Sequence, residues 1–158
     1  MAGPPPKVRQ RKTDTCALAC LRMILAQHGT AVEEAVLEEN AAKEPGGVSI
    51  EELARLAGHH GLRAQIEALH LPDIAALVSK GVFPIVYLNR VHIDQELRAA
   101  RRVALRRSVV HAVVPVRISQ RFVTFIDPRL GIARRISREK FDAAQRDLAH
   151  WCVVCKPG

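Results

Sequence analysis

A change in hydrophobic periodicity near Gly81 constrains the fold more than any other feature of the sequence. Before it, apolar residues recur at the three- and four-residue intervals typical of an amphipathic helix. After it, they alternate within short segments that are rich in β-branched residues. We therefore expect helices first and a mostly antiparallel sheet after them, which is an α+β architecture.

The helical half contains four predicted helices. The first helix begins after Asp14, whose side chain is suited to cap it. Two capping-box patterns, starting at Thr30 and at Ser49, each predict a further helix. A fourth is expected after Pro72, and a short strand precedes it at Leu62 to Leu69.

The second half contains five predicted strands, with a helix starting at Ser137 between the last two. The strands are Val82 to Leu88, Val109 to Ile118, Phe122 to Ile126, Ile132 to Ile136 and Trp151 to Val154. The second and third strands are joined by a reversal at residues 118–120, so residues whose numbers sum to about 238 or 239 should face each other.

Two segments stand apart from this pattern. Asp94 to Arg107 is an arginine-dense helical insertion between two strands, whose default interpretation is a solvated surface helix. Residues 1–9 include three consecutive prolines and are expected to form a flexible arm. Residues 10–158 then form a single domain, as the length of 158 residues suggests.

The charge balance limits the classes of partner. Lys and Arg number 24 against 16 Asp and Glu, a formal charge of +8, which favours nucleic acid, an anionic membrane face or an acidic peptide. Aromatic residues make up only 4% of the chain, so nucleic acid is the weaker alternative. The sequence shows no secretory signal and no apolar run of membrane-spanning length, so we expect a cytoplasmic protein without membrane insertion.

One cysteine lies where a nucleophilic thiolate would be favoured. Cys16 falls in the first turn of the first predicted helix, where unpaired backbone N–H groups favour a thiolate over a thiol. Among seven histidines, His111 is the best placed base, and the hairpin register puts Asp127 beside it. A carboxylate there would hold the imidazole in one tautomer and stabilise its protonated form. The alternative for Cys16 is an inert buried residue.

In this order along the chain, the residues resemble the C39 peptidases, the leader-cleaving domains of bacteriocin and peptide exporters. The resemblance rests on Gln10, on Cys16 six residues later with its helix, on His111 within its strand, and on Asp127-Pro128. It spans roughly residues 8–155 and implies a papain-like fold. It also implies roles: Cys16 as nucleophile, His111 as general base and then acid, Asp127 as orienting group, and Gln10 as donor to the oxyanion.

The resemblance implies a cysteine endopeptidase that removes leader peptides after a Gly-Gly or Gly-Ala pair. An ABC-type peptide exporter is a candidate partner, and we expect no metal or other cofactor. Ala17, where the family usually has glycine, would lie against the substrate backbone, and Thr15 replaces an acidic residue. These departures leave open a second hypothesis, a leader-binding module without turnover. We also expect the insertion to attract an acidic leader through Arg101, Arg102, Arg106 and Arg107.

The remaining cysteines and histidines are given no functional role by the sequence. Cys20 is expected to pack in the core. The pair Cys152 and Cys155 has the spacing of a metal knuckle, but residues three apart in a strand point to opposite faces. The sequence suggests no partner for the other histidines, which are His28, His59, His60, His70, His92 and His150.

Overall fold

The computed structural model describes residues 3–94 and 110–158. Apart from Asp94, the predicted insertion lies outside the described residues, and so do Arg101, Arg102, Arg106 and Arg107. The role suggested for these arginines therefore stays a prediction.

Within the described residues, the predicted helices and strands occur in the predicted order, and two short strands and a 3-10 turn that were not predicted are added to them. The helices are α1 (Cys16–Gln27), α2 (Glu34–Glu39), α3 (Ile50–His59), α4 (Leu71–Ser79) and α7 (Arg138–Arg146), with a 3-10 turn η1 (Arg90–His92). The strands are β1 (Lys43–Glu44), β2 (Gly47–Val48), β3 (Leu62–Ala68), β4 (Ile85–Asn89), β5 (Val110–Ile118), β6 (Phe122–Asp127), β7 (Ile132–Ser137) and β8 (Trp151–Pro157).

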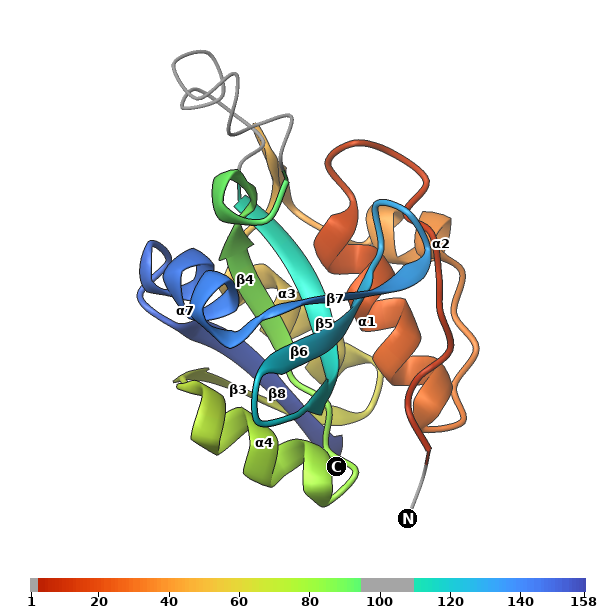
Figure 1. Ribbon diagram of the computed structural model, residues 1–158. Helices are drawn as coiled ribbons and strands as arrows, with labels where there is room; N and C mark the ends of the chain where they lie inside the picture. The colour runs from red at the N-terminus through yellow and green to blue at the C-terminus, as the bar shows by residue number, and fades with distance from the viewer. Residues whose placement is uncertain (1–2, 95–109) are drawn as a thin grey trace.

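A six-stranded sheet organises the molecule, and each of its neighbouring strand pairs is antiparallel. Its order is β3-β8-β4-β5-β6-β7, so the predicted α+β architecture is confirmed (Figure 1). Helices α1 and α3 contribute to one buried apolar cluster with Tyr87, Ala112 and Cys155. Helices α4 and α7 contribute to another with Leu88, Val113 and Cys152. Because neighbouring strand residues divide between the clusters, the helices cover opposite faces of the sheet.

Two helix starts differ from the prediction. Helix α1 begins directly at Cys16 with Thr15 as its N-cap residue, because the Asp14 carboxylate instead contacts Lys43 Nζ at 2.9 Å. The helix expected from Thr30 begins only at Glu34. The Thr30 N–H is bonded to the Leu25 carbonyl at 2.9 Å, so this part of the chain still closes the end of α1.

The β5–β6 hairpin also differs from the expected register. Its strands pair Ile118 with Val123 because the connecting loop is longer than predicted and is closed by a Ser119 N–H bond to the Phe122 carbonyl. A bulge between Pro115 and Arg117 then shifts the pairing back by one residue. Asp127 consequently lies diagonally from His111 rather than directly opposite it.

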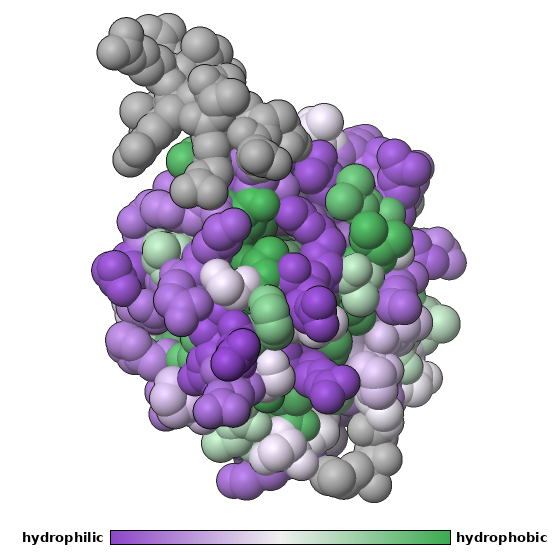
Figure 2. Space-filling view, in the orientation of Figure 1, coloured by the Kyte–Doolittle hydropathy of each residue, from purple (hydrophilic) through white to green (hydrophobic). Residues whose placement is uncertain are grey.

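On the face seen in Figure 2, most of the coloured residues are hydrophilic, and hydrophobic residues gather in small areas between them. None of the helices within residues 3–94 and 110–158 is long and apolar enough to cross a membrane. Residues 3–9, the described part of the expected arm, have no regular secondary structure, while Val8 packs against the core and the Gly3 carbonyl accepts from Gln27 Nε2 at 3.1 Å.

Candidate active site

Cys16 is the first residue of α1 and is partly accessible to solvent. Burial alone raises the pKa of its thiol, but a hydrogen bond and the charge of His111 act in the opposite direction. Backbone hydrogen bonds from Ala112 and Ala17 add to this effect. The net result is a pKa below the usual value of 9.0, so the thiolate is favoured at Cys16.

His111 lies at the start of β5 and is 4% exposed. Its Nε2 is 2.7 Å from Asp127 Oδ1, which leaves Nδ1 as the nitrogen for Cys16. Burial lowers the pKa of the imidazole, but the hydrogen bonds and charges of Asp127 and Cys16 outweigh burial and raise this pKa from 6.5 to about 9. The pair therefore favours a thiolate and an imidazolium.

Asp127 ends β6 and is fully buried. Burial raises the pKa of its carboxyl, but hydrogen bonds from His111, Arg134 and the Arg129 backbone hold that pKa well below its usual range. Besides His111, Oδ1 accepts the Arg129 N–H at 2.9 Å, and Oδ2 accepts Arg134 Nη1 at 2.9 Å. Asp127 is thus fixed as a carboxylate facing the imidazole.

A second layer of charges, which the sequence analysis did not identify, supports this carboxylate. Arg134 on β7 donates to Asp127 and also to Asp94 Oδ1, at 2.9 Å in each case. Asp94 is 3% exposed, and its Oδ2 accepts from Arg90 Nε at 2.8 Å. The sequence did contain one signal for Arg134, because it shows an arginine in the strand that follows the strand of Asp127. Nothing in the sequence pointed to Asp94, which borders the insertion.

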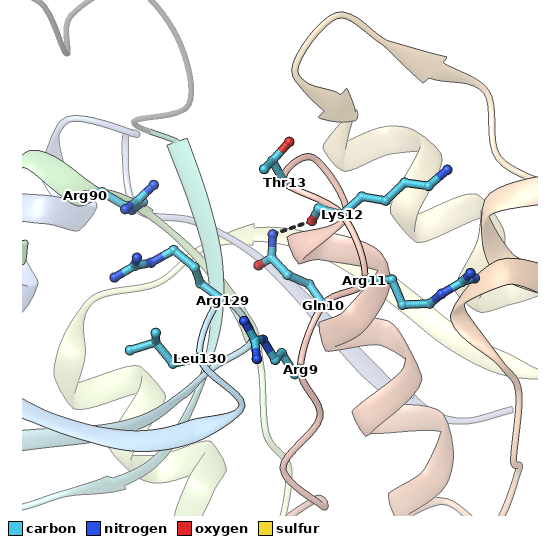
Figure 3. A pocket seen from close by; sticks show the side chains of 8 residues that line it. All are labelled: Arg9, Gln10, Arg11, Lys12, Thr13, Arg90, Arg129 and Leu130. Atoms are coloured by element: carbon cyan, nitrogen blue, oxygen red, sulfur yellow. Dashed lines mark hydrogen bonds between the residues drawn. The ribbon is translucent and has the colours of Figure 1, made fainter.

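Gln10 borders the same end of the sheet. Its backbone N–H donates to the Pro128 carbonyl at 2.7 Å, which joins its loop to the turn after Asp127. Its side-chain Nε2 donates to the Lys12 carbonyl at 2.7 Å, whereas Oε1 is buried without a hydrogen-bond partner among the residues that the structure describes. Figure 3 shows the amide between the start of α1 and Arg129. The pocket there holds about 500 Å³ and is lined by Arg9, Gln10, Arg11, Lys12, Thr13, Arg90, Arg129 and Leu130.

The structure brings Cys16, His111 and Asp127 together from α1, β5 and β6. Ala17 is 4% exposed and belongs to the core cluster, so its methyl group adds little to the surface that a peptide would meet. Thr15 is fully buried, and its Oγ1 bonds the Lys12 N–H and carbonyl at 3.0 Å each. Thr15 thus closes the turn that leads into α1, and both departures leave the three-residue arrangement intact.

The other cysteines pack as expected. Cys20 is fully buried on α1. Cys152 and Cys155 belong to the two apolar clusters on opposite faces of the sheet, so they cannot share one metal ion.

Comparisons with known proteins agree with this geometry. A family model described as the peptidase C39 family matches residues 5–149. A comparison with curated proteins finds no match.

Three of the solved structures that are similar to the chain illustrate its likeness to known folds. The first is the peptidase domain of Streptococcus ComA, described as a bi-functional ABC transporter involved in quorum sensing (15% identity, TM-score 0.71, covering 96% of this chain and 97% of that chain). The second is a putative C39-like peptidase from Bacillus anthracis (16%, 0.76, 97% and 94%). The third is a double glycine motif protease from an AMS/PCAT transporter, solved with its leader peptide (20%, 0.73, 99% and 94%). The shared fold is the papain-like fold that the family resemblance implied.

Proposed function

Because the chain belongs to the peptidase C39 family, we propose that it is a cysteine endopeptidase that cleaves leader peptides after a double-glycine type site. One observation carries the proposal. A thiol at a helix start, an imidazole and a buried carboxylate form one hydrogen-bonded series, with the pKa of Cys16 lowered and that of His111 raised. This is the arrangement that nucleophilic catalysis by a thiolate requires.

The proposed reaction is acyl transfer. The Cys16 thiolate attacks the carbonyl carbon of the scissile bond. The resulting oxyanion accepts hydrogen bonds from the Cys16 backbone N–H and from the Gln10 side-chain amide. Protonated His111 gives its proton to the leaving amine, and the carbon–nitrogen bond breaks to leave a thioester on Cys16. His111 then takes a proton from water, the resulting hydroxide attacks the thioester, and the thiolate is released.

The Gln10 amide can serve two acceptors at once. One N–H of its Nε2 donates to the Lys12 carbonyl at 2.7 Å, and the amide carries a second N–H that can donate to an oxyanion. A neutral amide suits the role because it donates a hydrogen bond without a charge that would compete for the thiolate. Removing such a donor typically costs about 100- to 1000-fold in rate.

The substrate and partner follow from the family. Two of the similar structures come from transporters, one described as an ABC transporter and the other as an AMS/PCAT transporter, and the second is a double glycine motif protease in complex with a leader peptide. These relatives support a peptide substrate with a double-glycine leader and a peptide exporter as partner for this chain. A cytoplasmic location is part of the same proposal.

The test is cleavage of a synthetic peptide that carries an amphipathic leader ending in Gly-Gly. We expect the chain to cut after the second glycine, and Cys16→Ala to abolish the cut, as judged by mass spectrometry. Cys155→Ala, which changes a buried cysteine of β8, is the matched control and should still cleave. Cleavage that persists in Cys16→Ala would contradict the assignment. Leader binding without cleavage by the unmodified chain would identify the leader-binding module instead.

A further inference from the structure

A cluster of metal-ligating side chains lies on the face of the sheet covered by α4 and α7. His70 immediately precedes α4, Asp142 belongs to α7, and His150 ends the turn before β8. One ligand atom from each of the three residues lies within 4.8 Å of the other two. His150 Nε2 is 3.1 Å from Asp142 Oδ1, and the His70 and His150 rings are stacked with their centroids 3.9 Å apart.

The backbone holds His150 firmly in this cluster. His150 is 8% exposed, and both Ala149 and His150 have left-handed backbone conformations, with φ of 55° and 59°. The His150 N–H donates to the Gln145 carbonyl at 3.0 Å, and its own carbonyl accepts the Leu69 N–H at 2.9 Å. The imidazole is therefore fixed beside α7 before any ligand binds.

The cluster is open to solvent on one side. A pocket of about 300 Å³ is lined by His70, Leu71, Pro72, Arg138, Glu139 and Asp142. Glu139 lies one helical turn before Asp142 and adds negative charge to the rim. His70 is exposed, so an ion that enters from this side can reach its ring.

We propose that His70, Asp142 and His150 bind one Zn²⁺ ion. Two imidazole nitrogens and one carboxylate oxygen are ligands that zinc accepts, with bonds of about 2.0–2.2 Å, and solvent can supply a fourth ligand. Such bonds place neighbouring ligand atoms roughly 3.3 Å apart in a tetrahedral site. The 3.1 Å between His150 Nε2 and Asp142 Oδ1 already agrees with that spacing.

Two adjustments complete the site. The rings of His70 and His150 are inclined by only 25°, and a metal ion lies in the plane of each imidazole that binds it, so the His70 ring turns out of the stack. Asp142 keeps its second oxygen on Arg146 Nη2, at 2.7 Å, and offers Oδ1 alone to the ion. An outer partner of this kind orients a ligating carboxylate. Hard cations such as Mg²⁺ and Ca²⁺ prefer oxygen ligands, so zinc suits this set better.

The experiment is a calorimetric titration of zinc chloride into the Cys16→Ala chain, in which the thiol of the active site cannot hold the ion. We expect one Zn²⁺ per chain and a rise in Tm with added zinc. His70→Gln and Asp142→Asn, made separately, should each weaken binding by at least about tenfold. The matched control changes His59 and His60, two adjacent histidines at the end of α3, to Gln together and should alter affinity less than about twofold.

Three results would overturn the proposal. The first is an absence of saturable uptake up to about 100 µM zinc, a weak affinity even for a surface site. The second is uptake that survives both cluster substitutions. The third is uptake that disappears in the double control variant, since that would place the ion at the end of α3.

Discussion

The start of α1 and the strand β8 both present cysteines, but they give the thiols opposite properties. At Cys16, hydrogen bonds and the charge of His111 overcome burial and lower the pKa below 9.0. At Cys152 and Cys155, burial dominates and raises the pKa to about 12 in each case. This difference shows that burial alone makes a thiol inert. A nearby cation and N–H donors are needed to make the thiol a nucleophile.

Cys20 sharpens the comparison because it lies on the same helix, one turn after Cys16. It is fully buried, and its pKa is raised well above 9.0, first by burial and then by the charges of Cys16, Asp127 and Glu34. A position on α1 is therefore not sufficient. The first residue of the helix differs because it faces His111 across the end of the sheet.

The largest expected effect comes from removing the imidazole. His111→Ala removes the hydrogen bond and the positive charge that His111 gives Cys16, so the pKa of the Cys16 thiol should rise. We expect kcat/KM for leader cleavage to fall by about 10³- to 10⁴-fold, the upper part of the range that general acid–base groups contribute. A fall of less than tenfold would show that His111 is not the base.

A smaller loss should follow from Asp127→Asn. If an amide N–H faces His111 Nε2, this nitrogen accepts a hydrogen bond and the imidazole proton stays on Nδ1. A protonated Nδ1 cannot take a proton from Cys16. We expect about a 10²- to 10³-fold loss in kcat with KM little changed. Circular dichroism of the variant checks that the fold survives the loss of a buried charge.

Arg134→Gln should cost about fivefold to tenfold in kcat, because Arg134 positions Asp127 and touches no reacting atom.

The pH profile of the Arg134→Gln variant separates a positioning role from a role in folding. In the unmodified chain, kcat/KM should fall as the pH rises through about 9, where His111 loses the proton meant for the leaving amine. Without the Arg134 charge, Asp127 attracts that proton more strongly, so this limb should move to higher pH. Arg135→Gln, an exposed neighbour, should leave the limb in place.

The smallest effect is expected in β8. Cys155→Ala should leave kcat/KM within about twofold and lower the free energy of unfolding by about 1 kcal/mol, because it removes a buried sulfur from the core and no group from the site. Denaturant unfolding and peptide cleavage measure the two quantities. A loss of activity that exceeds the loss of folded protein would link β8 to catalysis.

The sequence predicted those features that depend on local pattern. The switch from helical to alternating periodicity located the elements, and Ser49 caps α3 as its capping box indicated. The pairing of β5 with β6 was predicted, but its register was wrong because a longer loop and a bulge are not visible in an alternating pattern. The start of α2 was wrong because Thr30 serves the end of α1.

What escaped prediction depends on tertiary contacts. Arg134 and Asp94 are 40 residues apart in the chain and meet only once the sheet has formed. His70, Asp142 and His150 likewise come from three elements and share no sequence spacing that indicates a site. For the same reason, the family resemblance located Cys16, His111 and Asp127 but gave no information about the groups behind them.

The most direct test of the central claim is the rate at which each cysteine is alkylated by iodoacetamide at pH 7, read by mass spectrometry of the digested protein. The contrast between α1 and β8 predicts that Cys16 reacts first, while Cys20, Cys152 and Cys155 stay unmodified in the folded chain. It also predicts that His111→Ala slows Cys16 strongly. If Cys16 reacts no faster than the thiols of β8, or at the same rate without His111, the thiolate–imidazolium pair does not exist.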